Sequence, residues 1–206
     1  MNGGATLLIA AAVAVNSAFC VLGMVAANHY NIEVALARGR GLAIVLAATV
    51  VEAAALLLYP QTASSAAIVI AFGAAIAGAA CDAACGYVFD AITLPALASM
   101  LLVAAVTHDV ARVLTGAAAA GGALALLYAI TRGRGLGLGD VKLACCIGAA
   151  SGTRMALEAL GIAFVLGGAY AGFVLLTRRG NRKDEMRFGP YLLAGFAAVA
   201  LRGALG

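Results

Sequence analysis

Charged residues are scarce in this chain. Only 11% of its 206 residues are Asp, Glu, Lys or Arg, whereas 65% are hydrophobic, and an ordinary soluble domain contains about 25% charged residues. No polar stretch is long enough to fold alone. The few basic residues are scattered among loops, and nucleic-acid binding needs a basic face or stripe. The composition therefore predicts an all-α, polytopic membrane helix bundle, a single domain over residues 1–206 that contacts lipid and binds no nucleic acid.

Paired cysteine motifs are also missing. The five cysteines are Cys20, Cys81, Cys85, Cys145 and Cys146, and none forms a Cys-x-x-Cys pair. No zinc-ligand spacing of the usual kind is present. We interpret the cysteines as small apolar residues inside helices, because a free cysteine behaves as a buried hydrophobe. The prediction is that the protein uses no metal and no cofactor.

Lys and Arg are absent from residues 1–4, which precede the first apolar run. A cleavable signal peptide carries positive charge before its apolar segment. We therefore expect the first apolar run to be a retained transmembrane helix.

Long apolar runs dominate the rest of the chain. About 20 apolar residues are needed to cross the hydrocarbon core of a bilayer. We expect about eight transmembrane helices, of which the sixth is short. They cover approximately residues 5–27, 41–59, 64–84, 91–106, 110–130, 141–150, 155–177 and 188–205.

The distribution of basic residues predicts the orientation of these helices. With eight spans, the loops on one side hold ten Lys and Arg residues and those on the other side hold three. Cytoplasmic loops are enriched in Lys and Arg, so the loops after spans one, three, five and seven are predicted to be cytoplasmic. Asp82, Asp90 and Asp140 fall on that side, although the acids were not used to assign it. We expect a multi-pass protein of the cytoplasmic (inner) membrane.

Asp140 follows a glycine-rich segment at the cytoplasmic start of an apolar helix. One interpretation is structural, since a carboxylate at this position caps the helix and complements its dipole. Gly137 and Gly139 favour a functional interpretation, because glycines permit positive φ and allow another chain to lie close. A substrate held in an extended form beside an aspartate needs that access.

Asp82 is the natural partner of Asp140, because it lies at the same predicted depth on another helix. Alone it could be a residue at a helix interface. Two carboxylates in a partly dry site cannot easily both be charged, so they share one proton. One can then activate a water while the other protonates a carbonyl oxygen, as peptide hydrolysis by paired acids requires.

Three segments, in order along the chain, resemble the A24 family of type IV prepilin peptidases, which are GxGD intramembrane aspartyl proteases. The first, Asp82 with residues 86–90 and 93–95, resembles the family's first aspartate segment. The second, Gly137–Leu143, resembles the family's G-x-G-D-x-K-L motif. The third, Phe188-Gly189-Pro190-Tyr191, resembles the family's Phe-Gly-Pro segment.

The resemblance implies that residues of about 64–205 form the catalytic core of an aspartic endopeptidase. It would remove the basic leader of a prepilin of a type IV pilus, or of a pseudopilin of a protein-secretion system, at the cytoplasmic face. Asp82 and Asp140 would be catalytic. The remaining site residues would shape the substrate-facing loop or surround the dyad, and Lys142 would favour a negative charge or bind an acidic substrate group. These residues are Asp90, Gly137, Gly139, Lys142, Phe188, Gly189 and Pro190.

The chain also departs from the family pattern. Bifunctional bacterial members carry a domain with two Cys-x-x-Cys pairs near the N-terminus and methylate the new N-terminus of their product. Only residues 28–40 occupy that place here. We therefore predict a short form without the zinc-bearing domain and do not extend the prediction to methyltransferase activity.

Two other functions remain open. A small transporter would use Glu52, Glu158 and the aspartates as a proton or ion path, although such proteins often show broken helices in matching halves, and a single glycine-rich break is seen here. The second alternative is a structural relative without catalytic activity, but the presence of both aspartates gives it no support. Within the bundle, Glu52 and Glu158 are most simply interpreted as protonated, hydrogen-bonded residues.

Overall fold

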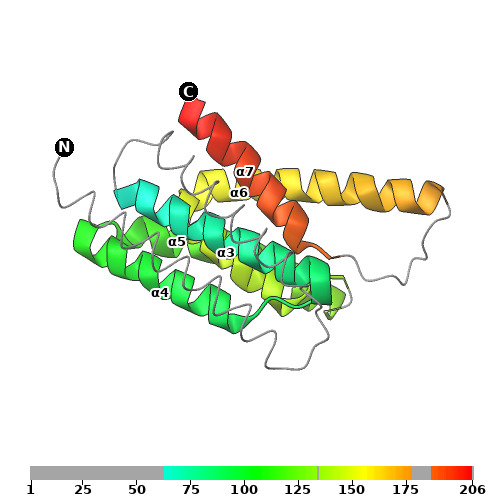
Figure 1. Cartoon of the computed structure of the whole chain (residues 1–206), viewed down its shortest axis with the longest axis horizontal. Helices are drawn as coiled ribbons and strands as arrows, with labels where there is room; N and C mark the ends of the chain where they lie inside the picture. Colours follow the sequence, from blue (N-terminus) through cyan, green and yellow to red (C-terminus); the bar gives the residue numbers. More distant parts are fainter. Residues whose placement is uncertain (1–62, 134, 178–186, 206) are drawn as a thin grey trace, which may run out of the picture.

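The computed structural model describes residues 63–133, 135–177 and 187–205. Every regular element in these ranges is an α-helix (Figure 1). The helices are α3 (Ala63–Cys85), α4 (Asp90–Thr107), α5 (Val110–Thr131), α6 (Leu138–Leu176) and α7 (Gly189–Leu205). The predicted all-α class is therefore confirmed for this part of the chain.

Four of the predicted spans agree with helices to within one residue at each end. These are the third, fourth, fifth and eighth, which correspond to α3, α4, α5 and α7. The first two predicted spans, together with Glu52, lie outside the described residues. Four of the described helices, α3 to α6, are long and apolar enough to cross a membrane. The predicted count of about eight spans is not confirmed.

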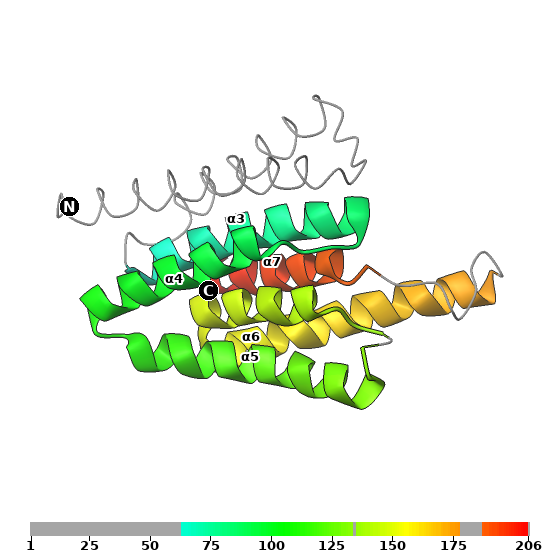
Figure 2. The same ribbon diagram turned by 90° about the horizontal axis from the view of Figure 1, so that it is seen from below.

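Helix α6 changes direction at Gly152. This residue has φ 75° and ψ 172°, which is non-helical, and glycine adopts a positive φ without steric cost. The chain doubles back there, so that the second half of α6 runs opposite to the first (Figure 2). The two halves correspond to the sixth and seventh predicted spans, and Gly152 lies in the turn predicted between them. However, α6 begins at Leu138 rather than near residue 141, so the glycine-rich motif extends into the helix.

Small residues bring the helices into close contact. A Cβ atom placed on Gly116 of α5 would lie 2.1 Å from the carbonyl oxygen of Gly148 in α6. One placed on Gly195 of α7 would lie 2.2 Å from the carbonyl oxygen of Ala159. In lipid, such small residues allow backbones to approach and maximise van der Waals contact. The glycines therefore set the spacing of α5 and α7 against α6.

Helix α3 is the most deeply buried of the helices that are candidates to span the membrane. Of its residues 66–83, 89% are buried, compared with 28% or less for the other three candidate helices. It ends at Cys85, and the next residue, Gly86, has φ 72° and donates from its N–H to the carbonyl oxygen of Asp82 at 2.8 Å. This central helix therefore delivers Asp82 to one end of the bundle.

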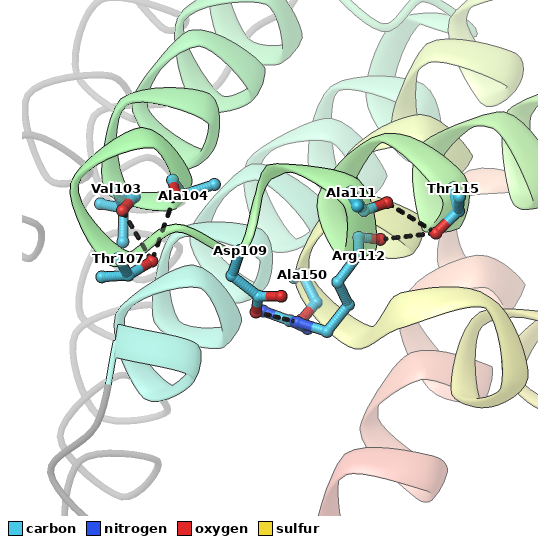
Figure 3. Close-up of polar contacts among 8 residues, drawn as sticks. All are labelled: Val103, Ala104, Thr107, Asp109, Ala111, Arg112, Thr115 and Ala150. Atoms are coloured by element: carbon cyan, nitrogen blue, oxygen red, sulfur yellow. Dashed lines mark hydrogen bonds and ion pairs between the residues drawn. The ribbon is translucent and has the colours of Figure 1, made fainter.

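The ends of the helices define two ends of the molecule. The end of α3 and the starts of α4, α6 and α7 lie together at one end (Figure 2). At the opposite end, Arg112 in the first turn of α5 contacts both Asp109, which precedes α5, and the residues before the turn of α6 (Figure 3). There Arg112 donates from Nη1 to the carbonyl oxygen of Ala150 at 2.9 Å and from Nε to the Asp109 carboxylate at 2.5 Å. Arg112 thus ties the turn of α6 to α5.

Candidate active site

Asp82 lies in the last turn of α3, with only 5% of its surface exposed. Its Oδ2 atom accepts a hydrogen bond of 2.8 Å from the backbone N–H of Gly189, which lies 107 residues later. Gly189 is the first residue of α7, so its N–H has no partner within the helix. A Cβ atom on Gly189 would lie 2.9 Å from Oδ2 of Asp82. The absence of a side chain at Gly189 therefore permits the contact.

Asp140 is the third residue of α6 and is 6% exposed. Its Oδ2 atom accepts a hydrogen bond of 3.1 Å from the N–H of Gly137, the residue that precedes the helix. The structural interpretation as a helix cap is thus confirmed for this oxygen. The other oxygen, Oδ1, is buried and has no hydrogen-bond partner among the described residues. Since buried polar atoms are normally paired, this unpaired oxygen requires an explanation.

The structure brings the two predicted aspartates to the same end of the bundle. They are close enough for the charge of one carboxylate to act on the other. Neither carboxylate forms an ion pair with a Lys, Arg or His side chain in residues 63–133, 135–177 and 187–205. Two neighbouring acids in one buried site favour the state in which they hold a single proton between them. Such a pair can both accept and donate a proton.

Arg187 is a site residue that the sequence analysis did not identify. Its guanidinium donates to the carbonyl oxygen of Ala83, next to Asp82, and its charge reaches the Asp82 carboxylate. In the sequence, the feature that could have indicated Arg187 is its position directly before the Phe188-Gly189-Pro190 segment.

The two motif glycines make specific contacts within the chain itself. Gly137 has an extended backbone with φ −86°, and Gly139 lies within α6, so neither residue adopts the positive φ that glycine permits. The close approach expected at Gly139 is made by Val88 of this chain. A Cβ atom on Gly139 would lie 2.7 Å from that of Val88. Gly139 therefore allows the segment between α3 and α4 to pack on α6, and Gly137 supplies the N–H that holds Asp140.

Lys142 and Asp90 were both predicted to surround the dyad, and the structure pairs them with each other. Their side chains form an ion pair that joins the first residue of α4 to the N-terminal part of α6. The side chains are 37% and 56% exposed, respectively. The ion pair of Lys142 is therefore made with Asp90 at the rim of the site.

The Phe188-Gly189-Pro190 segment packs against the second half of α6. Phe188 is 4% exposed, and its ring lies 5.0 Å from that of Phe164, centroid to centroid. Pro190 is the second residue of α7, where its missing N–H removes no helical hydrogen bond. The segment thus fixes the position of Gly189 against Asp82.

Glu158 is not part of this site. It pairs with Arg154 on its own helix, at 3.2 Å, and with Arg202 of α7. In the part of the chain that the structure describes, no group of three or more His, Cys, Asp or Glu side chains is placed to hold a metal ion.

Comparison with known proteins places this arrangement in a family. Residues 67–172, about half of the chain, match the model of the type IV leader peptidase family. The chain belongs to this family. The resemblance inferred from the motifs is thereby confirmed, and the matched range includes Asp82, Asp140 and Lys142.

One similar protein is the prepilin leader peptidase/N-methyltransferase of Bacillus subtilis (strain 168). It is 36% identical over 110 residues, which cover 53% of this chain and 44% of the relative. The chain thus matches less than half the length of this leader peptidase. No solved structure matches.

Proposed function

We propose that this protein is an intramembrane aspartic endopeptidase that cleaves the leader from prepilin-like proteins, with Asp82 and Asp140 as its catalytic pair. The observation that carries the proposal is the unpaired, buried Oδ1 of Asp140 beside the equally buried Asp82. A buried acid without a basic partner is costly in an apolar bundle. This cost is accounted for if the acid acts on a substrate.

The chemistry follows from two acids that hold one proton. The ionised carboxylate takes a proton from a water, whose oxygen attacks the carbonyl carbon of the scissile peptide bond. The protonated carboxyl group gives its proton to the carbonyl oxygen, which forms a tetrahedral diol. When this collapses, the C–N bond breaks and one hydroxyl group of the diol returns its proton to the carboxylate that had protonated the carbonyl oxygen, so a carboxylic acid forms and the pair again holds one proton. The leaving nitrogen takes the proton from the carboxyl group that first accepted it. The amides of Gly189 and Gly137 fix the orientation of the two carboxylates.

A prepilin or pseudopilin is the proposed substrate. The support is membership of the leader peptidase family and the likeness to the Bacillus subtilis prepilin leader peptidase. The proposal does not extend to the N-methyltransferase activity in that relative's name, because the match covers only 44% of the relative.

The proposed site of cleavage is the cytoplasmic face of the cytoplasmic membrane. The support is the excess of Lys and Arg in the loops that share the side of Asp82 and Asp140 in the sequence, since such an excess is typical of cytoplasmic loops. The clustering of the helix ends that carry both aspartates agrees with this arrangement (Figure 2).

A transporter is less well supported. Glu158, one of the acids that would have formed an ion path, is paired with Arg154 and Arg202. These contacts join α6 to α7 and give Glu158 a structural role.

A cleavage assay in liposomes tests the proposal. The substrate is a full-length prepilin from the same source, and the proteins are wild type, Asp82→Asn and Asp140→Asn. We expect each substitution to lower the rate by roughly 10²- to 10⁴-fold, which is the usual contribution of a general acid or base. Asp109→Asn, at the opposite end of the bundle, is the matched control and should cleave at the wild-type rate. Cleavage by wild type that persists in either active-site variant would contradict the two-aspartate mechanism.

A further inference from the structure

A pocket of about 220 Å³ lies between the end of α5, the second half of α6 and the segments that lead to the two aspartates. Leu127, Leu136, Phe164 and Phe188 contribute apolar side chains to its lining, and Gly168 contributes bare backbone. Thr131 also lines the pocket, but its hydroxyl donates to the carbonyl oxygen of Leu127 within the same helix at 2.9 Å. The pocket therefore offers an apolar environment without a charged group.

The pocket and the aspartate pair share the same two backbone segments. Leu136 directly precedes Gly137, whose N–H holds Asp140. Phe188 directly precedes Gly189, whose N–H holds Asp82. A polypeptide bound across the two carboxylates therefore passes beside the pocket. This continuity favours a substrate side chain, rather than an unrelated ligand, as the occupant.

The size of the pocket suits one large apolar side chain. An engineered apolar cavity of about 150 Å³ is sufficient to bind benzene, so about 220 Å³ accommodates a Leu, Met or Phe side chain. Gly168 contributes to this space, because a Cβ atom placed on it would meet no atom within 4 Å. A larger residue at this position would fill the pocket without displacing backbone.

We infer that this pocket binds a large apolar side chain of the substrate close to the scissile bond, and that Gly168 determines which side chains fit. The inference rests on the proposed peptidase function and adds a specificity determinant to it. Burial of a side chain of this kind increases affinity by roughly 10- to 100-fold. Losing it should raise KM more than it lowers kcat, because the pocket does not contact the reacting atoms.

The test combines a change in the enzyme with a change in the substrate. The enzyme variant is Gly168→Leu, and the matched control is Gly161→Leu. Gly161 is also on α6 with no atom within 4 Å of an added Cβ, but it does not line the pocket. The substrates are the prepilin and variants in which each large apolar residue within four positions of the cleaved bond is replaced by Ala. KM and kcat are measured for every combination.

We expect one Ala substitution in the substrate to raise KM for the wild-type enzyme by roughly 10- to 100-fold. Gly168→Leu should raise KM for the unchanged prepilin by a similar factor, and it should have little further effect on that Ala variant. Such non-additivity is the signature of two groups in direct contact. Gly161→Leu should leave KM unchanged for every substrate.

The inference is overturned if Gly168→Leu has no effect on any substrate, or if its effect is the same for all substrates. The second result would point to a lipid chain or a structural role for the pocket. To separate this from failure of the proposed function, substrate binding is also measured by fluorescence anisotropy in an Asp140→Asn background. If wild type does not cleave but binding still depends jointly on residue 168 and one apolar side chain, the peptidase proposal fails and the pocket assignment survives. If binding depends neither on residue 168 nor on an apolar side chain of the substrate, the pocket assignment is wrong.

Discussion

At the end of the bundle that holds the candidate active site, the buried acids Asp82 and Asp140 accept hydrogen bonds from backbone N–H groups. In the other half of the bundle, the acids are paired with arginines. Asp109 contacts Arg112, and Glu158 contacts Arg154 and Arg202. One chain therefore handles carboxylates in two ways.

The difference follows from the cost of charge in an apolar environment. Pairing an acid with an arginine at a partly exposed position compensates its charge, but contributes little to stability. Holding an acid by a backbone N–H, without a direct ion pair, leaves the carboxyl group able to take or give a proton. The second arrangement is expected where chemistry occurs, and the first where helices only need to be joined.

Among substitutions that test this difference between the two regions, Gly189→Ala is expected to have the largest effect. The added Cβ would lie 2.9 Å from Oδ2 of Asp82 and 3.3 Å from the backbone of Ala79, so the carboxylate must move. We expect kcat to fall by roughly 10- to 100-fold, because small errors in the placement of catalytic groups are costly. The measurement is the cleavage rate at saturating prepilin. Gly172→Ala, where an added Cβ meets no atom within 4 Å, is the control, and an equal loss there would refute the steric explanation.

A smaller effect, on stability rather than on catalysis, is expected from Arg112→Met. The substitution removes the hydrogen bond to the Ala150 carbonyl and leaves that oxygen without this donor. We expect the free energy of unfolding to fall by about 1–2 kcal/mol, with kcat per folded molecule unchanged. Thermal unfolding in detergent micelles measures the first quantity, and the cleavage assay the second.

Arg154→Met provides the matched control for Arg112→Met. Arg154 is at the same end of the bundle, but its side chain is 92% exposed, so we expect no resolvable change in unfolding temperature. If Arg112→Met instead lowered kcat without affecting stability, the opposite end of the bundle would not be merely structural.

The smallest effect is expected at the rim of the site, where Lys142 pairs with Asp90. Because both side chains are substantially exposed, Lys142→Met and Asp90→Asn should each lower the cleavage rate by no more than about 3-fold. The charge-swapped double variant, Asp90→Lys with Lys142→Asp, should recover the wild-type rate. A large loss in Lys142→Met that the swap does not rescue would show that Lys142 acts on the aspartates or the substrate.

Much of this arrangement was readable from local sequence patterns. The bounds of α3, α4 and α5 follow the apolar runs closely, because hydropathy and chain length decide which residues can span a bilayer. Asp82 and Asp140 stand out as acids in apolar surroundings, and the motif around Asp140 identifies the family. The contacts of Gly137 and Gly139 were not readable in this way, because a glycine indicates either unusual dihedral angles or close packing, and the sequence does not distinguish the two.

The sequence by itself determined that the chain forms apolar helices, that two acids interrupt them and that the chain belongs to the type IV leader peptidase family, because composition and motif spacing are local properties. Only the tertiary structure decided what those acids contact. The N–H of Gly189 reaches Asp82 across 107 residues, Lys142 reaches Asp90 across 52, and Arg202 reaches Glu158 across 44. These partners depend on how the helices pack. That packing is set by close contacts such as Gly116 with Gly148. Small residues allow helices to approach closely, but their positions in the sequence do not predict which helix will pack against them.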